Sequence, residues 1–539
     1  MRSVGRWIVL AICLLAVGAY SPPPHRDGRP NILLIVADDL GYADLGVYGS
    51  DIRTPRIDAL AAEGVILTQF HTSPLCAPTR AMLLTGNNNH VAGMARQFAS
   101  PLHTVHVPGY EMHLSDRVAP MPLLLREAGY HTYTAGKWHL GTEAEHGPAA
   151  AGFERSFGLL HGAGSHYGAT GFFEGGSVYR EDGVEVEYPE GRYTTELFTD
   201  RLIEFIDEGR EDGRPFFAFA AYTSPHWPLQ VPEEYLDLYA GRYDQGYDRL
   251  REQRFESLKR AGIIPADSDL PPRNEAIRPW EELTPEERRR EAREMELYAA
   301  MVENLDHHVG RLIDYLKSNG LYENTLIVFM SDNGAAGEDF FYVGPYVEYI
   351  QSHYDNSYEN MGRPSSWVSY GPPWAEAGSA PFSRYKGYTR EGGIVAPMIV
   401  SGAGVRRRGE IDAAYLTVMD LAPTFLELAG GEYPADGSVK PMLGESMVAF
   451  LEGRASSVHG ENYVTALYHA GRAFLRRGRW KLVNLEPPLR EADMQLFDLV
   501  ADPGETTDLS AAEPEVFAAM LQLWRTARVE LGIILESDL

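Results

Sequence analysis

Cysteine is the residue type that this chain has least of. Its 539 residues include two cysteines, Cys13 and Cys76. Met1–Ala19 has the order of a secretory signal peptide, with basic Arg2 and Arg6, then an apolar stretch, then small residues. We therefore expect a periplasmic or secreted protein whose mature chain keeps only Cys76. A lone cysteine excludes an intramolecular disulfide, and without further context it is most often a small buried hydrophobe.

Long apolar runs are also missing. The apolar part of the signal-like segment, Trp7–Ala16, has roughly ten residues, about half of what a membrane-spanning helix needs. Bulky Ile12 in front of Cys13 disfavours processing as a lipoprotein. We expect no stable membrane insertion, with an uncleaved anchor as the alternative.

Positive charge is scarce. The chain has 48 lysines and arginines against 76 aspartates and glutamates, and loss of Arg2 and Arg6 with the signal would change its net charge from −28 to −30. Such a charge opposes binding to nucleic acids and to anionic membrane surfaces. An anionic substrate would therefore have to be captured by a local basic pocket. Internal repeats and zinc-type Cys/His spacings are absent from the sequence.

The chain is longer than one domain usually is, so we predict more than one part. After the signal come a Pro-rich linker, 20–29, and a large domain, 30–455, in which 233–296 is interpreted as a charged, solvated insertion. Short alternating segments followed by a helical pattern, Pro514–Leu531, predict an antiparallel sheet and a closing helix in a C-terminal subdomain, 456–539.

Three further expectations concern the large domain. Apolar residues at helical spacing predict an amphipathic helix over Leu297–Lys317. Ile66–His71 is interpreted as one strand. The glycine- and aromatic-rich stretch Ala335–Pro381 is expected to be a long irregular segment, which is usually functional.

Polar side chains follow three continuous apolar runs that we interpret as buried strands. These runs are Pro30–Ala37, Pro215–Tyr222 and Thr325–Met330, and they are followed by Asp38-Asp39, by His226 and by Asp332-Asn333, respectively. Open α/β sheets place their ligands at the carboxyl ends of their strands. Turns and a helix cap are the alternative explanation of the acidic residues, but the convergence of three strand ends favours a site.

The segment around Cys76 reads HTSPLCAPTRAMLLTG. Pro78 fixes its own φ and restricts the residue before it, which suits a rigid turn before a helix at Arg80–Leu84. Cys76 would lie near the N-terminus of that helix, where backbone N–H groups favour an anion. Arg80 adds a permanent, forked cation nearby.

The motif C-x-P-x-R followed by AMLLTG resembles the signature of type I sulfatases, which belong to the alkaline-phosphatase-like superfamily. Further segments resemble this family in the same order, namely NILLIVADDLGYADLG, GKWHLG, RRGRWKLVNLE and LFDLVADPGETTDLS. PHWPLQVPEEYLDL and DNSYENMGRPSS are most similar to bacterial arylsulfatases. The resemblance implies an α/β fold with a large mixed, mostly parallel sheet sandwiched by helices, and a smaller C-terminal antiparallel sheet plus helix.

The resemblance also implies a metal and a modified residue. A dedicated maturation enzyme would oxidise Cys76 to 3-oxoalanine (formylglycine). Residue 76 would then join Asp38, Asp39, Asp332 and Asn333 around one divalent cation. All-oxygen ligation suits hard cations, and we expect Ca²⁺, with Mg²⁺ as the alternative.

The remaining implied roles belong to cationic and protonatable side chains. Arg80, Lys137 and Lys386 would neutralise the sulfate. His226, together with Lys386, would protonate the leaving oxygen, and His139 would take a proton from the second hydroxyl of the formylglycine hydrate. Asp332 is also expected to accept the proton of the attacking hydroxyl.

The expected function is hydrolysis of sulfate monoesters, such as an aryl sulfate to a phenol and inorganic sulfate, through a formylglycine-hydrate nucleophile and a covalent sulfo-enzyme intermediate. The substrate would be a small-molecule or glycan sulfate ester. One alternative is a phosphonate or phosphate ester hydrolase on the same fold, since one-metal phosphonate hydrolases share C-x-P-x-R, whereas two-zinc relatives carry histidine where Asn333 stands. The other is a non-catalytic protein that binds sulfated glycans.

Overall fold

The computed structural model describes residues 28–98, 106–339, 344, 346–535 and 538. The predicted signal 1–19 and most of the predicted linker 20–29 lie outside these residues. Within the described part of the chain, no helix combines the length and the apolar character that a bilayer crossing needs.

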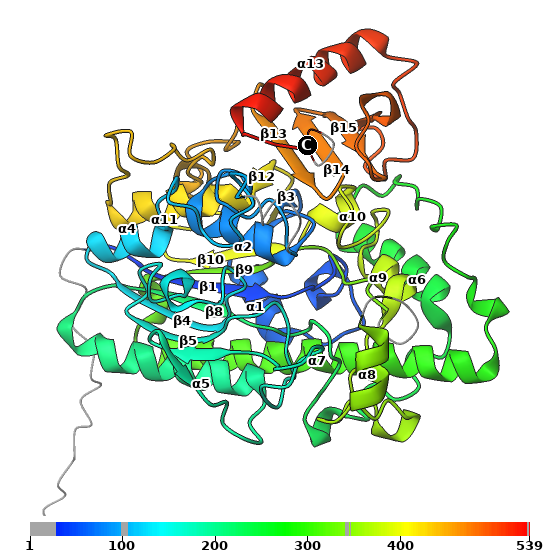
Figure 1. Cartoon of the computed structure of the whole chain (residues 1–539), viewed down its shortest axis with the longest axis horizontal. Coiled ribbons are helices and arrows are strands. Elements are labelled where there is room, and N and C mark those ends of the chain that lie inside the picture. The colour runs from blue at the N-terminus through cyan, green and yellow to red at the C-terminus, as the bar shows by residue number, and fades with distance from the viewer. Residues whose placement is uncertain (1–27, 99–105, 340–343, 345, 536–537, 539) are drawn as a thin grey trace, which may run out of the picture.

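A mixed sheet, ten-stranded within the described residues, forms the centre of the molecule (Figure 1). Across the sheet the strands are β11 (Glu410–Asp412), β2 (Val65–Leu67), β10 (Met398–Gly402), β9 (Thr325–Ser331), β1 (Asn31–Ala37), β8 (Phe216–Ala221), β4 (His131–Lys137), β5 (Arg155–Leu159), β6 (Tyr179–Glu181) and β7 (Val184–Val186). The five strands from β9 to β5 run parallel, while β10 and β6 run antiparallel to them.

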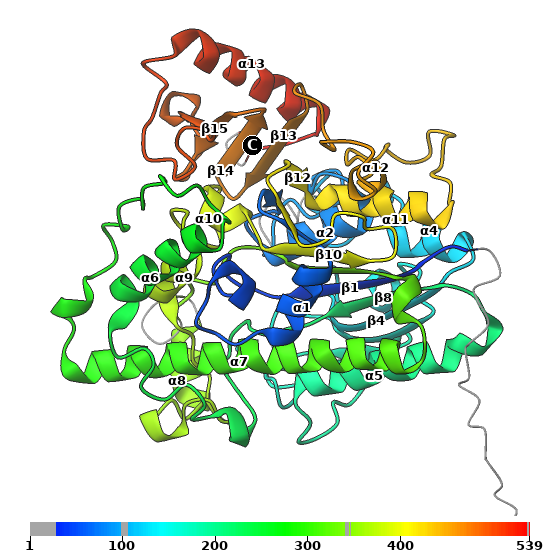
Figure 2. The same ribbon diagram turned by 180° about the vertical axis from the view of Figure 1, so that it is seen from behind.

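Two layers of helices cover the sheet, which explains why β1 is apolar from Ile32 to Ala37. One layer contains α1 (Pro55–Glu63), α5 (Thr194–Gly209) and α7 (Pro285–Ser318), and the other contains α2 (Cys76–Thr85), α4 (Met121–Glu127) and α11 (Leu421–Ala429). Figures 1 and 2 show these layers below and above the sheet. Short helices α10 (Glu391–Ile394) and α12 (Val448–Leu451) lie on the upper side. The predicted α/β sandwich is confirmed.

The C-terminal part forms a second, smaller sheet with its own core. Its strands, in order and all antiparallel, are β13 (Val464–His469), β14 (Arg472–Arg477), β15 (Trp480–Asn484) and β16 (Gln495–Asp498). Helix α13 (Pro514–Glu530) packs on this sheet, where Trp524 is buried with Leu475 and Leu496. In Figure 1 this subdomain, in orange and red, lies above β12 (Leu416–Thr417) and α10.

Two segments rich in charge differ from the sequence-based expectations. Helix α7 begins at Pro285 rather than Leu297, because Thr284 and Glu287 form a capping box. Segment 233–296 is not simply solvated, since α6 (Gly246–Arg260) within it buries Leu258 and Arg254. Helix α6 is amphipathic, but its few apolar residues are hard to recognise in the sequence among so many charged ones.

Two stretches expected to be uniform also differ. Ala335–Pro381 includes α8 (Val347–His353) and α9 (Gly371–Gly378), so it is not irregular throughout. The single strand expected over Ile66–His71 is divided between β2, in the large sheet, and β3 (Phe70–His71), which pairs with β12. The chain thus leaves the main sheet before it reaches Cys76.

Candidate active site

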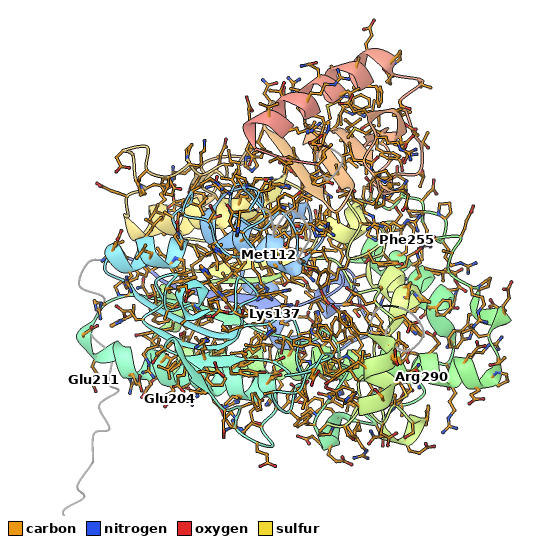
Figure 3. All side chains as sticks on the ribbon, in the orientation of Figure 1. Met112, Lys137, Glu204, Glu211, Phe255 and Arg290 are labelled. Atoms are coloured by element: carbon orange, nitrogen blue, oxygen red, sulfur yellow. The ribbon has the colours of Figure 1, made fainter. Side chains whose placement is uncertain are left out.

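The predicted site residues meet where parallel strands of the large sheet end. Asp38 and Asp39 follow β1, Asp332 and Asn333 follow β9, and Lys137 is the last residue of β4, all of them buried. Figure 3 shows Lys137 in the interior of the molecule. The sequence predicts a loop at Lys137, but the strand continues through Gly136. That glycine has a φ of 127°, and a Cβ there would lie 1.8 Å from the carbonyl oxygen of Ala221.

Cys76 is the first residue of α2, so the helix begins earlier than the predicted Arg80–Leu84. Leu75 before it is extended, and the whole Cys76 side chain is buried. Its Sγ lies 3.8 Å from Asp39 Oδ1. Residue 76 therefore lies at the N-terminal end of α2, where the helix dipole gives a positive potential.

Three cations pair with three carboxylates in the active-site cluster, which we define as Asp38, Asp39, Asp332, Arg80, Lys137 and Lys386. Lys137 Nζ donates to both oxygens of Asp38, at 2.9 and 2.7 Å. Arg80 donates through Nε and Nη2 to Asp332 Oδ2, at 3.0 and 2.8 Å. Lys386 Nζ donates to Asp39 Oδ2 at 2.8 Å. The formal charges of the cluster cancel, so a bound cation would supply the surplus positive charge that capture of an anion needs.

The carboxylates also fit a divalent cation. Ligand atoms of Asp38, Asp39, Cys76 and His226 all lie within 4.8 Å of one another. Asp332 is outside this group because its carboxylate faces Arg80, although its Oδ1 accepts a hydrogen bond from the backbone N–H of Asp39 at 3.3 Å. Burial raises the pKa of Asp38 to about 8 despite the adjacent Lys137. Lys137 therefore does not fully offset the cost of burying an ionised carboxylate, and a bound cation would offset the rest.

Asn333 gives a second indication of a cation. Its Nδ2 donates to Asp39 Oδ1 at 2.6 Å, whereas its buried Oδ1 has no hydrogen-bond partner among the described residues. A buried amide oxygen without a partner is unfavourable. Such an oxygen beside several carboxylates is a ligand of the kind that Ca²⁺ and Mg²⁺ prefer.

His226 lies between Lys386 and Asp39. Its Nε2 is 3.4 Å from Lys386 Nζ and 3.3 Å from Asp39 Oδ2. Its Nδ1 is 2.6 Å from the carbonyl oxygen of Trp227, so we assign the ring proton to Nδ1. Burial, and then Lys386, lower the pKa of His226 well below its ordinary value. At neutral pH the imidazole is therefore uncharged, and the proton on this side of the site belongs to Lys386.

His139 is held in an unusual conformation at the same site. Its φ is 60°, and that of Asp39 is 67°, both in the left-handed region that few residues other than glycine adopt, although Asp and His do so more often than most. Its ring lies against Gly162, where a Cβ would come within 2.3 Å of Cε1. Burial, followed by Lys137, lowers the pKa of His139 well below its ordinary value, so this imidazole is uncharged at neutral pH, which is the form that a general base requires.

Sequence reasoning missed the residues that support this site. Arg254, from the supposed solvated insertion, is buried and pairs with Asp44. Asp44 in turn accepts hydrogen bonds from Gly41 N at 3.0 Å and from Tyr298 Oη at 2.6 Å, which fixes the loop after β1. Glu338 Oε1 lies 3.5 Å from Lys386 Nζ. Asp44 could have been suspected because it lies five residues after Asp39 in the sequence. No sequence pattern pointed to Glu338.

The comparisons with known proteins agree with this arrangement. The Sulfatase family model matches residues 30–431, so the chain belongs to the sulfatase family. It is accordingly a sulfuric ester hydrolase. The chain is 40% identical to the arylsulfatase of Klebsiella aerogenes over 83% of this chain and 97% of that protein. It is 38% identical to an uncharacterized sulfatase of Schizosaccharomyces pombe over 95% of both chains.

A solved structure extends the similarity to three dimensions. The crystal structure of Ps i-CgsB in complex with k-i-k-neocarrahexaose superposes with a TM-score of 0.64, at 26% identity, over 92% of each chain. The matched part includes the C-terminal region that the family model leaves out. The predicted family and fold are thus confirmed, while the individual roles of the site residues stay predictions.

Proposed function

We propose that the protein hydrolyses aryl sulfates and that Cys76, oxidised to formylglycine, supplies the nucleophile. The observation that supports this most is the position of residue 76, at the first turn of α2 and beside the active-site cluster. Burial raises the pKa of the Cys76 thiol well above its ordinary value, although Lys137 and Lys386 lower it. An unmodified thiol would therefore stay protonated and be a poor nucleophile.

A hydrated aldehyde at position 76 suits both halves of the reaction. One hydroxyl oxygen forms a bond to sulfur while the bond from sulfur to the phenol oxygen breaks, and the phenol leaves with a proton. The second hydroxyl then loses its proton, its oxygen forms the aldehyde C=O, and the sulfate departs from residue 76. Water restores the hydrate, so one water is consumed for each ester.

The side chains of the site would divide this work. Arg80 and Lys137 would hold the sulfate oxygens. His226 and Lys386 would together serve the leaving oxygen, as the sequence predicts, and because the His226 imidazole is uncharged the proton itself would come from Lys386. His139 would take the proton of the second hydroxyl. Asp38, Asp39, Asp332 and Asn333 would hold a divalent cation, which we propose is Ca²⁺ and which would neutralise charge on the sulfate.

Aromatic side chains next to His226 favour an aryl leaving group. The rings of His226 and Trp227 have centroids 4.2 Å apart, and Phe172 contacts Trp227 at 5.4 Å and Tyr346 at 4.6 Å. Glu338 places a carboxylate beside Lys386, which would disfavour leaving groups that carry further sulfates. A sulfated oligosaccharide is the competing substrate class, since the structure of Ps i-CgsB is a complex with k-i-k-neocarrahexaose.

The setting of the protein is part of the proposal. The signal-like segment 1–19 supports export to the periplasm or beyond. A maturation enzyme that oxidises Cys76 would be an obligatory partner before the enzyme is active.

Peptide mass spectrometry and substrate comparison test the proposal. We expect protein made together with a maturation enzyme to carry the aldehyde at residue 76. We also expect it to turn over 4-nitrophenyl sulfate faster than 4-nitrophenyl phosphate or a phosphonate monoester, with Cys76→Ala as the inactive control. A free thiol at residue 76 in fully active protein would contradict the mechanism. Preference for the phosphonate would instead favour the alternative hydrolase.

A further inference from the structure

A second cluster of buried charges lies between the large domain and the C-terminal subdomain. We call it the interface network; it consists of His71, Glu391, Arg476, Lys481 and Glu505, all of them buried. Lys481 Nζ lies 2.6 Å from Glu391 Oε1 and 2.9 Å from Glu505 Oε1. His71 Nε2 lies 2.9 Å from both Glu391 Oε2 and Arg476 Nη1. Through charged side chains, β15 thus reaches α10 and β14 reaches β3.

The interface network joins the two chain segments that carry catalytic residues. Glu391 follows Lys386 closely in the sequence, and His71 precedes Cys76. The two segments also bind each other directly, because Gly387 N donates to the carbonyl oxygen of Pro74 at 2.8 Å. The charged contacts of the C-terminal sheet therefore act on the same short stretch of backbone that holds Lys386.

The C-terminal sheet contacts this stretch at two further points. Arg472 of β14 donates through Nη1 to the carbonyl oxygen of Gly387 at 3.3 Å, and its guanidinium lies 4.4 Å from the ring centre of Tyr388. Thr389 Oγ1 donates to the carbonyl oxygen of Asn484 at 3.3 Å. Segment 385–394 is therefore held by β14 and β15 over most of its length.

The charges of the network balance. Burial lowers the pKa of His71, which leaves Lys481 and Arg476 opposite Glu391 and Glu505. Burial alone would raise the pKa of Glu391, but Lys481 and His71 lower it below its ordinary value. Buried ion pairs add little net stability over an apolar contact, yet they fix one geometry, because displacement leaves a charge without a partner. A network of buried ion pairs is therefore better suited to fixing the position of segment 385–394 than to stabilising the contact between the two domains.

We propose that the C-terminal subdomain positions Lys386 for catalysis, with Lys481 as the central positioning residue and Arg472 as the second. The effect on turnover rests on the proposed function, in which Lys386 supplies the proton to the leaving oxygen. Neither Lys481 nor Arg472 touches the active-site cluster in any contact of the described residues. Both act on Lys386 through the backbone from Tyr385 to Ile394.

The test compares two aryl sulfates in the full-length, matured enzyme. Phenolate is more basic than nitrophenolate and needs a proton more, so misplacement of Lys386 should slow phenyl sulfate most. For Lys481→Met we expect kcat/KM for phenyl sulfate to fall about tenfold more than that for 4-nitrophenyl sulfate, because the Lys386 proton is the one affected. Lys386→Ala should show the same pattern, and the double variant should add nothing to it.

A matched control separates positioning from loss of stability. Leu496→Ala opens the apolar core of the same small sheet, away from the interface network, and should lower the melting temperature while it affects both esters equally. Arg472→Gln is the second variant in case Lys481→Met does not fold, since the Arg472 side chain is partly exposed. In Arg472→Gln, kcat/KM for phenyl sulfate should again fall more than that for 4-nitrophenyl sulfate, but by a smaller factor than in Lys481→Met.

Hydrogen exchange gives a readout that does not depend on sulfate turnover. The backbone amides in 385–394 should exchange faster in Lys481→Met and in Arg472→Gln, but not in Leu496→Ala. Unchanged exchange there, or equal losses for both esters, would overturn the positioning role. A wild-type enzyme inactive on both esters would instead refute the proposed function, while the exchange result would still decide the coupling.

Discussion

The active-site cluster and the interface network lie at the two ends of segment 386–391 and contain similar side chains. Both consist of buried carboxylates matched by lysine and arginine. In the interface network each carboxylate oxygen of Glu391 has a partner, Lys481 on one side and His71 on the other. Glu505 Oε1 in the same network has no hydrogen bond, but it lies 2.9 Å from its ion-pair partner Lys481 Nζ. In the active site, by contrast, Asn333 Oδ1 and His139 Nδ1 have neither a hydrogen bond nor an ion pair among the described residues.

Backbone strain does not separate the two regions in the same way. Asp39 and His139 have positive φ values at the active site, but Glu505 in the interface network has one too, at 54°. Strained backbone and unsatisfied polar atoms persist only where the surroundings hold them. The atoms left without a partner are therefore the better guide: a buried cluster of charge is a candidate active site when such atoms remain for a ligand, and a candidate support when they do not.

The largest expected effect is confined to the active site. Cys76→Ala removes the nucleophile and should lower kcat by at least about 10⁴-fold, as loss of a covalent catalyst does in other enzymes. The midpoint of urea unfolding should barely change, since the side chain is small and belongs to no hydrogen-bonded network beyond the weak contact with Asp39. Steady-state kinetics and unfolding curves on the same preparation check both parts. A large loss of stability in Cys76→Ala would contradict this prediction, because it would mean that Cys76 has a structural role.

Removal of the cation should come next. Chelation is expected to lower turnover by at least about 10²-fold, because a major source of charge stabilisation is lost, and added Ca²⁺ should restore it. Elemental analysis should find one cation per chain, and the same content in Lys481→Met, whose substitution lies in the interface network. Two zinc ions per chain, or full activity without a cation, would contradict the assignment.

The interface network should respond in stability rather than in metal content. Glu391→Gln removes one of the two carboxylates that pair with Lys481 and leaves the buried Lys481 and Arg476 opposite Glu505 alone, which should cost about 3 kcal/mol in the free energy of unfolding. Urea unfolding at neutral pH measures this cost. Arg525→Ala, which breaks the exposed pair with Glu491, is the control and should leave the midpoint unchanged. Equal changes in the free energy of unfolding for Glu391→Gln and Arg525→Ala would show that the buried network contributes no more to stability than an exposed ion pair does.

The smallest effect concerns a histidine behind the active site. His166 Nε2 lies 3.1 Å from the carbonyl oxygen of His226, and burial lowers the pKa of His166 to about 4. The unfolded chain then binds more protons below pH 6.5, so stability is lost as the pH falls from 6.5 towards 4. Between pH 7.0 and 5.5 this residue should account for about 1 kcal/mol.

Unfolding at these two pH values, in wild type and in His166→Gln, measures that contribution. The variant should lose less stability on acidification than the wild type does. His353→Gln, at an exposed position, should behave like the wild type. Identical pH dependence in all three proteins would mean that His166 is not held neutral by the fold.

The sequence predicts strand ends well because a buried parallel strand is a continuous apolar run. The meeting of Asp38, Asp332 and His226 at one edge of the sheet therefore follows from the sequence alone. The antiparallel sheet of the C-terminal subdomain is likewise predicted from alternating apolar residues and turns, and its last helix, predicted over Pro514–Leu531, ends one residue earlier, at Glu530.

Contacts between distant charged residues could not be predicted in this way. Arg254 belongs to a segment rich in charge, and its burial depends on Asp44, which the chain brings to it only after folding. The same holds for Lys481 and Glu391, whose pairing requires two domains to meet. Local patterns report how a residue relates to its neighbours in sequence, and an ion pair across the fold leaves no such pattern.

The burial of Cys76 limits the period during which another protein could reach its thiol. Pro74, just before it, is tied to Gly387, and His71 is tied to Arg476, 405 residues further along the chain. At a synthesis rate of roughly 5–20 residues per second, about 20–80 s pass between the appearance of Cys76 and that of its last covering strands. A maturation enzyme could reach the thiol only during that interval, or while the chain is kept unfolded for export. The rate of chain elongation would then help to set the fraction of molecules that ever become active.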